Sequence, residues 1–172
     1  VVRRNDASVL AWGSGYDGQS GSLTGSAKVE VNYGEFVDYQ VLAGSSFWLR
    51  SDGTLWAAGN NMAGQLGIGA TSMNETTPRK ILDGVTQMAI GGSEMGDGLF
   101  GMALKNDGSV WTWGANQYGQ LGQGTTLAGA SPDAVTLSKK AISISAGALH
   151  ALAVLEDKTV VGWGYNGNRA LG

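Results

Sequence analysis

The sequence contains no cysteine, two prolines and a single histidine among its 172 residues. The lack of cysteine excludes disulfide bonds, thiolate zinc sites and a cysteine nucleophile. Charged residues make up 15% of the chain, against about 25% in a typical soluble domain. A net charge of −3 provides no overall basic surface for phosphates. No apolar run reaches the ~18 residues of a membrane helix. We therefore expect neither nucleic-acid binding nor membrane insertion.

Glycine is abundant instead, with 29 residues, and 42% of the chain is hydrophobic. So much glycine without a Gly-X-Y period excludes collagen. The hydrophobic content argues against disorder, because a disordered chain lacks the apolar surface that offsets ordering entropy. The composition is typical of a folded chain with many tight turns.

An aromatic strand ending in glycine recurs four times, and in three copies a Gly-Gln pair follows closely. The anchoring glycines are Gly13, Gly59, Gly114 and Gly164, so the unit repeats roughly every 50 residues. Strand-like units at this period indicate a propeller or a solenoid. We expect the tryptophan beside the anchoring glycine to pack between neighbouring units, because an indole buries a large apolar area.

Each repeat is predicted to form about four short antiparallel strands. Asp-Gly pairs between alternating apolar runs predict tight hairpins. These hairpins join residues 47–50 to 55–58 and residues 102–105 to 110–113. First strands are expected at 36–44, 85–91 and 141–147, and weaker fourth strands at 27–31, 77–82 and 134–137.

The predicted fold class is all-β, a β-propeller of four-stranded antiparallel blades with about three and a half blades present. Residues 1–172 form one partial domain, with repeats at approximately 1–35, 36–82, 83–137 and 138–172.

Two segments carry a specific resemblance to a known family. Residues 104–124 (LKNDGSVWTWGANQYGQLGQG) and residues 49–69 (LRSDGTLWAAGNNMAGQLGIG) resemble repeats of the regulator-of-chromosome-condensation type. Residues 146–164 are similar to the start of that repeat. The resemblance covers nearly the whole chain and implies a propeller, usually of seven blades. This chain then corresponds to about half a ring, so we expect further chain, a second copy or a partner to complete it.

The sequence offers no constellation of catalytic residues. His150 is the single histidine, and no Gly-x-Ser-x-Gly nucleophile elbow is present. Two Gly-x-Gly-x-x-Gly matches, at 13–18 and 162–167, fall in the repeated turns. A dinucleotide site requires this motif to lead into a helix, and neither match is expected to do so. We expect no enzyme activity, no cofactor and no metal site.

The clearest irregularity is an insertion of about five residues near 93–99, relative to the following repeat. Loops on a rigid scaffold commonly carry function, so this insertion is the first candidate for a partner-contact loop. A harmless insertion accounts for the same residues, and both interpretations stay open. The candidate contact residues are Glu94, Met95, Asp97, Leu99 and Phe100.

Two further groups are weaker candidates for partner contact. Met73, Glu75 and Arg79 lie in what is predicted to be a long polar connection over residues 70–80. Three tyrosines near the glycine-rich turns are expected to form an aromatic rim, because aromatic residues are enriched in protein interfaces. These are Tyr16, Tyr118 and Tyr165.

The resulting hypothesis is a non-catalytic scaffold that binds a protein partner through its loops, of bacterial or phage origin. The alternative is a structural or receptor-contact component of a cell-surface or virion assembly. This alternative gives a weak preference for an extracellular, cell-surface or virion location. Guanine nucleotide exchange, known in the family, is a weaker alternative still.

Overall fold

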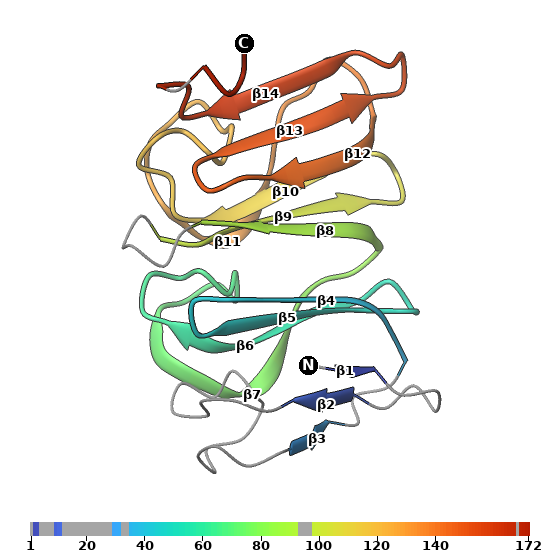
Figure 1. Ribbon diagram of the computed structural model, residues 1–172, viewed down its shortest axis with the longest axis vertical. Helices are drawn as coiled ribbons and strands as arrows, with labels where there is room; N and C mark the ends of the chain where they lie inside the picture. Colours follow the sequence, from blue (N-terminus) through green and yellow to red (C-terminus); the bar gives the residue numbers. More distant parts are fainter. Residues whose placement is uncertain (1, 4–8, 12–28, 32–34, 93–97, 168) are drawn as a thin grey trace.

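The computed structural model describes residues 2–3, 9–11, 29–31, 35–92, 98–167 and 169–172. Every regular element in these residues is a β-strand, and the strands form four antiparallel sheets that follow one another along the molecule (Figure 1). No helix that could span a bilayer occurs among them. The chain is thus a partial β-propeller, as the repeats predict.

Strand order within each sheet follows the sequence. The first sheet contains β1 (Val2–Arg3), β2 (Val9–Ala11) and β3 (Val29–Val31). The second contains β4 (Phe36–Leu42), β5 (Ser45–Arg50), β6 (Leu55–Asn61) and β7 (Ser72–Leu82). The third contains β8 (Val85–Gly91), β9 (Phe100–Lys105), β10 (Val110–Gly114) and β11 (Gly129–Ala134). The fourth contains β12 (Ala141–Ala146), β13 (His150–Leu155) and β14 (Val160–Gly164).

Asp-Gly hairpins set the register of the two central sheets. Gly53 and Gly108 have φ angles of +79° and +84°, which glycine adopts at little steric cost. The flanking strands then pair as Leu49 with Leu55 and Leu104 with Val110. Both predicted hairpins are therefore confirmed.

Glutamines join the first strands of neighbouring sheets. The Gln40 side-chain oxygen on β4 accepts a 2.9 Å hydrogen bond from the Ile90 N–H on β8. One sheet further along, Gln87 donates to the Ile144 carbonyl at 2.9 Å and accepts from the Ile144 N–H at 3.1 Å. These bonds satisfy partly buried backbone groups on the first strands of adjacent sheets.

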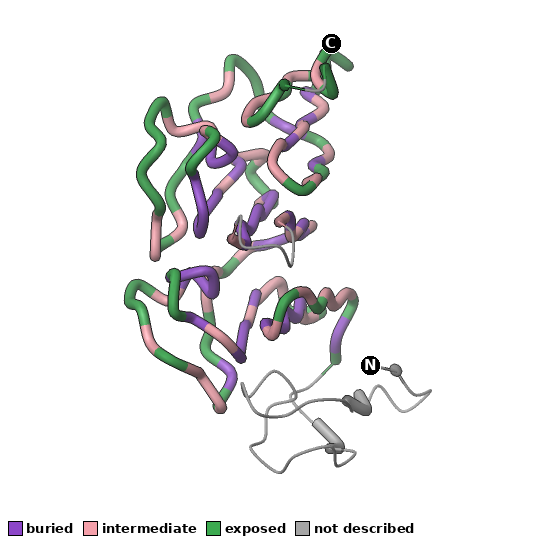
Figure 2. The backbone as a smooth tube through the Cα atoms, turned by 60° about the vertical axis from the view of Figure 1, so that its left-hand side comes forward, coloured by how far each residue is buried: buried purple, intermediate pink, exposed green. Residues whose placement is uncertain are grey.

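The core consists of apolar layers between consecutive sheets (Figure 2). Most buried residues lie in the strands, and shorter buried stretches lie in the loops at 64–67 and 120–121. Phe47, Leu66 and Trp113 belong to the layer between the second and third sheets. Phe100 and Met102 belong to the layer between the third and fourth. The third sheet therefore contributes to both layers.

Two fourth strands differ from the prediction. β7 contains the strand predicted at 77–82 but extends back to Ser72, through residues expected to be a polar connection; its outer position leaves all but one of its residues partly or fully exposed. A solvated edge strand needs few apolar residues, so the polar sequence of β7 does not distinguish it from a loop. The strand predicted at 134–137 is β11, which ends at Ala134 and includes Pro132. An edge strand tolerates proline because its outer side needs no N–H donor.

Candidate functional site

The two ends of the blades differ in construction. One end, the hairpin face, carries the tight turns between second and third strands. The other end, the loop face, carries long segments that follow each third strand, at residues 62–71, 115–128 and 165–172. Figure 1 shows the long segments on its left side and the tight hairpins on its right.

A repeated asparagine holds each loop in shape. The Asn61 Oδ1 accepts a hydrogen bond from the Leu66 N–H at 3.1 Å, and Asn116 does the same for Leu121 at 2.9 Å. The Asn116 Nδ2 also donates to the carbonyls of Thr125 and Leu127, at 3.0 and 2.9 Å. A rigid loop of this kind presents its outward side chains with little loss of conformational entropy on binding.

Tryptophans fasten each loop to the next blade. The Trp113 Nε1 donates to the Gln65 carbonyl at 3.1 Å, and the Trp163 Nε1 donates to the Gln120 carbonyl at 2.9 Å. A Cβ on Gly67 would lie 2.7 Å from the Trp113 ring, so only glycine allows this approach. The prediction that such tryptophans pack between blades is confirmed for Trp113, which is fully buried.

Large apolar side chains project from the loop face and its border. The pair Tyr118 and Tyr165 spans two blades, with ring centroids 5.2 Å apart and ring planes at 65°. Both tyrosines are about two-fifths exposed, at 40% and 38%. The other exposed members are Met62, Met73 and Leu127.

The three long segments of the loop face are also nearly uncharged. Segments 62–71 and 115–128 contain no charged residue, and segment 165–172 contains only Arg169. In contrast, the described lysines lie at or near the hairpin end: Lys80, Lys105, Lys139, Lys140 and Lys158. Depletion of charge together with tyrosine and methionine is the composition of a protein-interface core.

Apart from Leu99 and Phe100, the candidate residues of the sequence divide into three groups. Tyr118, Tyr165 and Met73 are exposed, as a contact role requires. Arg79 and Glu75 lie on β7 and form an ion pair at 3.7 Å. The remaining loop and rim candidates lie outside the described residues: Tyr16, Glu94, Met95 and Asp97.

The proposed contact role of Leu99 and Phe100 needs correction. Leu99 is 3% exposed and Phe100 is fully buried. Phe100 begins β9 and packs in the layer toward the fourth sheet, while the Leu99 carbonyl accepts the Ala115 N–H at 2.7 Å. Both side chains support the blade and leave no surface for a partner.

Sequence reasoning missed Met62 and Leu127 as surface residues. Their exposure is indicated by their place in the chain rather than by their residue type, because both lie in the uncharged loops that follow a third strand. Once the loop face is recognised, an apolar residue in those segments becomes a contact candidate.

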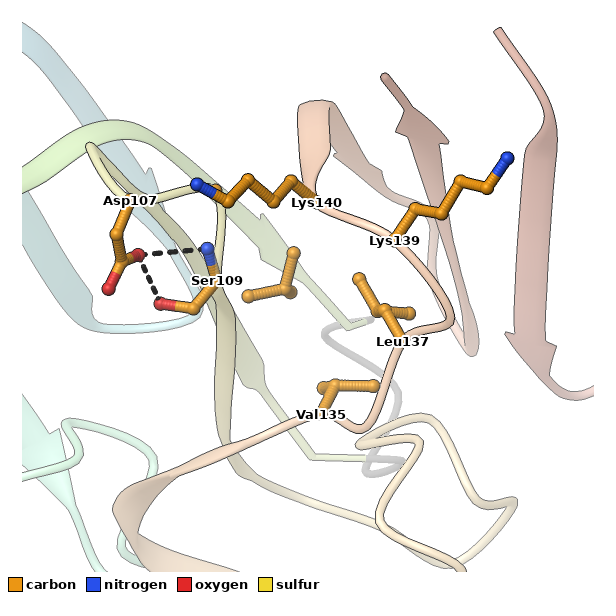
Figure 3. Close-up of a pocket in the computed structure, with 8 residues that line it drawn as sticks. Asp107, Ser109, Val135, Leu137, Lys139 and Lys140 are labelled. Carbon is orange, nitrogen blue, oxygen red and sulfur yellow. Dashed lines mark hydrogen bonds between the residues drawn. The ribbon is translucent and has the colours of Figure 1, made fainter. Parts of the chain in front are cut away.

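The hairpin face carries acidic turns with a structural role. Figure 3 shows Asp107 accepting hydrogen bonds from the Ser109 hydroxyl and N–H, at 2.6 and 2.9 Å. These two bonds lower the pKa of Asp107. Lys139 and Lys140 stand at the rim of the adjacent open cleft of about 500 Å³.

The described residues contain no group of three His, Cys, Asp or Glu side chains that could hold a metal ion.

Comparison with protein families gives a direct match. A family model described as "Regulator of chromosome condensation (RCC1) repeat" matches residues 52–93 and 107–154, and a second model with the same description matches residues 141–169. The human E3 ubiquitin-protein ligase HERC2 is 36% identical over 126 residues, which cover 72% of this chain and 2% of that protein.

Solved structures show the same fold. Human WBSCR16 matches with a TM-score of 0.76 at 22% identity, covering 91% of this chain and 42% of that one. Yeast RCC1 (Prp20), solved bound to Kap60, matches with a TM-score of 0.74 at 21% identity, covering 95% of this chain and 41% of that one. The chain thus spans about two-fifths of the length of these solved chains.

Proposed function

Because the chain belongs to the regulator of chromosome condensation (RCC1) repeat family, we propose that it is a non-catalytic scaffold that binds a protein partner through its loop face. The blades supply a rigid frame, and the loops supply the contact surface. A rigid scaffold with displayed loops is a common arrangement for recognition.

The observation that carries the proposal is the set of nearly uncharged long segments on the loop face, with exposed tyrosines and methionines in them and at their border. Tyr118 and Tyr165 already contact each other, so binding orders them at low entropic cost. Tyrosines placed in this way frequently supply a large share of binding energy. A structural relative of this fold, yeast RCC1 (Prp20), has been solved with the protein Kap60, which supports a protein as the partner class.

The finer parts of the functional hypothesis stay predictions. These are the bacterial or phage source, the role in a cell-surface or virion assembly, and guanine nucleotide exchange. The loop-face geometry supports recognition of a protein.

Photo-crosslinking tests which face binds. A photoreactive phenylalanine analogue is placed at position 118 on the loop face or, as a control, at position 142 on β12, where Ile142 is 47% exposed. The chain is then irradiated in extract from its source organism. We expect a discrete crosslinked protein from position 118 only, and its yield should fall about tenfold in Tyr165→Ala, as for a hot-spot residue.

Ile142→Ala serves as the matched variant, because it removes an exposed apolar side chain far from the loops. It should leave the crosslink at position 118 unchanged. Equal crosslinking from both positions, or an undiminished yield in Tyr165→Ala, would contradict loop-face binding.

A further inference from the structure

Methionine is the only sulfur-containing residue type in the sequence, which has five methionines and no cysteine. Met88 and Met102 lie in the core, at 2% and 0% exposure. Met62 and Met73 are 68% and 75% exposed. Met95 lies outside the described residues. The described methionines thus divide into a protected pair and an exposed pair.

The pairing of β6 with β7 brings the exposed pair to one place. Asn61 pairs with Ser72, and the Asn61 Nδ2 donates to the Ser72 hydroxyl at 3.2 Å. Met62 directly follows Asn61 in the sequence. Met73 is the extra residue of a β-bulge between this pair and the next pair of the ladder. A bulge redirects a side chain out of the regular alternation of the strand, which accounts for the exposure of Met73.

The two methionines line one open cleft of about 320 Å³, together with Thr71 and Ser72. We call it the methionine cleft. None of its four lining residues is charged. It lies where β6 ends and β7 begins, on the side of the molecule that also carries the loop after β10 (Figure 1). The methionine cleft therefore belongs to the proposed contact surface.

The exposure of Met73 is a property of its position in the blade. Leu127 has the equivalent position in the next blade, since each lies two residues before the residue that pairs with the anchoring glycine. Leu127 is 76% exposed. The blade of Met73 is followed by the third sheet, and the blade of Leu127 is preceded by the second. Among the described residues, neither kind of neighbour covers this position.

We infer that the methionine cleft is an oxidation site, at which hydrogen peroxide weakens binding of the protein partner. The inference rests on the proposed function, because it assigns a regulation to the same surface. Peroxide transfers one oxygen atom to the thioether sulfur of methionine. The O–O bond breaks, an S–O bond forms, and the second oxygen leaves as water. The sulfur is oxidised by two electrons, and the peroxide is reduced.

Oxidation changes the surface and spares the core. A sulfoxide is polar, so a partner that covers the cleft has to remove water from the new oxygen atom without a hydrogen bond in return. The buried positions of Met88 and Met102 protect both from the oxidant. Methionine sulfoxide reductases restore the thioether, so the change is reversible.

Peptide mapping by mass spectrometry tests the selectivity of the site. The folded 172-residue chain is treated with dilute hydrogen peroxide, which is then removed with catalase. We expect Met62 and Met73 to gain one oxygen atom at least about tenfold faster than Met88 and Met102, because exposure governs access of the oxidant. Comparable rates at all four methionines would overturn the inference.

Crosslinking from position 118 tests the effect on binding. The chain with the photoreactive analogue is oxidised in the same way and irradiated in gel-filtered extract. We expect the yield to fall about tenfold and to recover after treatment with both classes of methionine sulfoxide reductase, with dithiothreitol as the reductant. A yield that does not fall, or that falls and does not recover, would overturn the inference.

A double variant assigns the effect to the cleft. In Met62→Leu/Met73→Leu both side chains stay apolar but cannot accept oxygen, and Leu127 shows that leucine is compatible with the position of Met73. The yield of this variant should be the same before and after peroxide. An equal fall in the wild type and the variant would place the sensitivity elsewhere and also overturn the inference.

Crosslinking before oxidation is scored separately. Its absence would overturn the proposed function and this inference with it. A crosslink that is insensitive to peroxide would leave the proposed function standing and remove only the oxidation site.

Discussion

At the scale of single residues, the recurring glycines serve packing. Gly67 and Gly122 lie against the rings of Trp113 and Trp163, where a Cβ would approach to 2.7 and 2.8 Å. Real Cβ atoms do not come so close, so the backbone has to approach the indole without a side chain. The glycines of the Gly-x-Gly-x-x-Gly match at 162–167 belong to the same repeated turn, since Gly164 ends β14 and leads into a loop. A phosphate-binding turn would instead open a helix.

A single alanine leaves one buried donor unsatisfied. In the second blade, Gln65 donates to the Asn60 Oδ1 at 2.7 Å. In the third blade Ala115 replaces that asparagine, and the Nε2 of the fully buried Gln120 has no hydrogen-bond partner among the described residues. We expect Ala115→Asn to restore the acceptor and to raise the free energy of unfolding by about 1 kcal/mol, measured by urea denaturation.

Ala115→Leu is the matched control, because leucine has nearly the shape of asparagine without its acceptor. It should give no gain in the free energy of unfolding. If both variants stabilise the chain equally, filling of space rather than the hydrogen bond explains the effect.

Side-chain exposure was the part of the candidate site that residue type predicted least well. Tyr118 and Tyr165 are exposed as expected, because both lie in glycine-rich loops. Leu99 and Phe100 lie at the end of the predicted insertion, yet both are buried and β9 starts at Phe100. The position at which an insertion ends depends on strand pairing, which composition does not specify.

At the scale of elements, one hydrogen-bonding device recurs in the hairpins. Asp52 accepts from the hydroxyl and N–H of Thr54, and the Trp56 Nε1 donates to the same hydroxyl at 2.8 Å. Asp107, Ser109 and Trp111 repeat the arrangement in the next blade. The turn is therefore closed by an ionised aspartate.

The fourth blade gives this device a measurable pH dependence. The pKa of Asp157 is lowered from 3.8 to about 2. The largest cause is the 2.6 Å hydrogen bond from the Lys139 Nζ, and hydrogen bonds from the N–H and hydroxyl of Thr159 lower the pKa further. Because the folded-state pKa is depressed, the stabilisation is complete above the unfolded-state value and is lost as pH falls from 3.8 toward 2. Asp157→Asn should thus be less stable than the wild type near neutral pH, and the difference should vanish across this window.

Urea melts over a pH series measure that difference. Both groups are exposed, so the effect is expected to be small and to decrease with added salt. Asp133→Asn is a suitable control, because Asp133 is an exposed aspartate on β11, whereas the Lys139 ammonium pairs with Asp157. A difference between wild type and Asp157→Asn that persists below the pKa of the folded carboxyl would show that shape rather than charge matters.

Hairpin strands were predictable from the sequence, whereas outer strands were less so. Buried strands such as β9 and β10 carry an alternating apolar pattern and an Asp-Gly turn that fixes their register. Within the described residues, β7 and β11 each pair with a strand on one side only, and the other side of β11 is bonded to the preceding blade through a hydrogen bond from the Gly69 N–H to the Ala130 carbonyl. Outer strands therefore need neither an apolar sequence nor residues of high strand propensity, and β11 includes Pro132.

At the scale of the whole molecule, stability is divided among layers between neighbouring sheets. The third sheet contributes Trp113 and Ala103 to one layer and Phe100, Met102 and Leu104 to the other. In the described residues, the fourth sheet packs in one layer only. In arrays of repeats, the stability is approximately the sum of the stability of each repeat and of its interfaces with the neighbouring repeats. The position of a sheet in the array therefore determines how many neighbouring sheets are exposed when it unfolds.

This arrangement predicts different consequences for two equally buried core truncations. Leu155→Ala on β13 and Met102→Ala on β9 each remove a side chain that is 1% exposed or less, and each should cost about 2–5 kcal/mol. Leu155→Ala should speed amide exchange in β12–β14 and leave β5 and β6 unchanged, because the fourth sheet can open while the layer between the second and third sheets stays intact. Met102→Ala should speed exchange in both neighbours of the third sheet, because opening of that sheet exposes both layers. If Leu155→Ala accelerates exchange equally in all the sheets, the chain unfolds as one unit and the nearest-neighbour description is wrong.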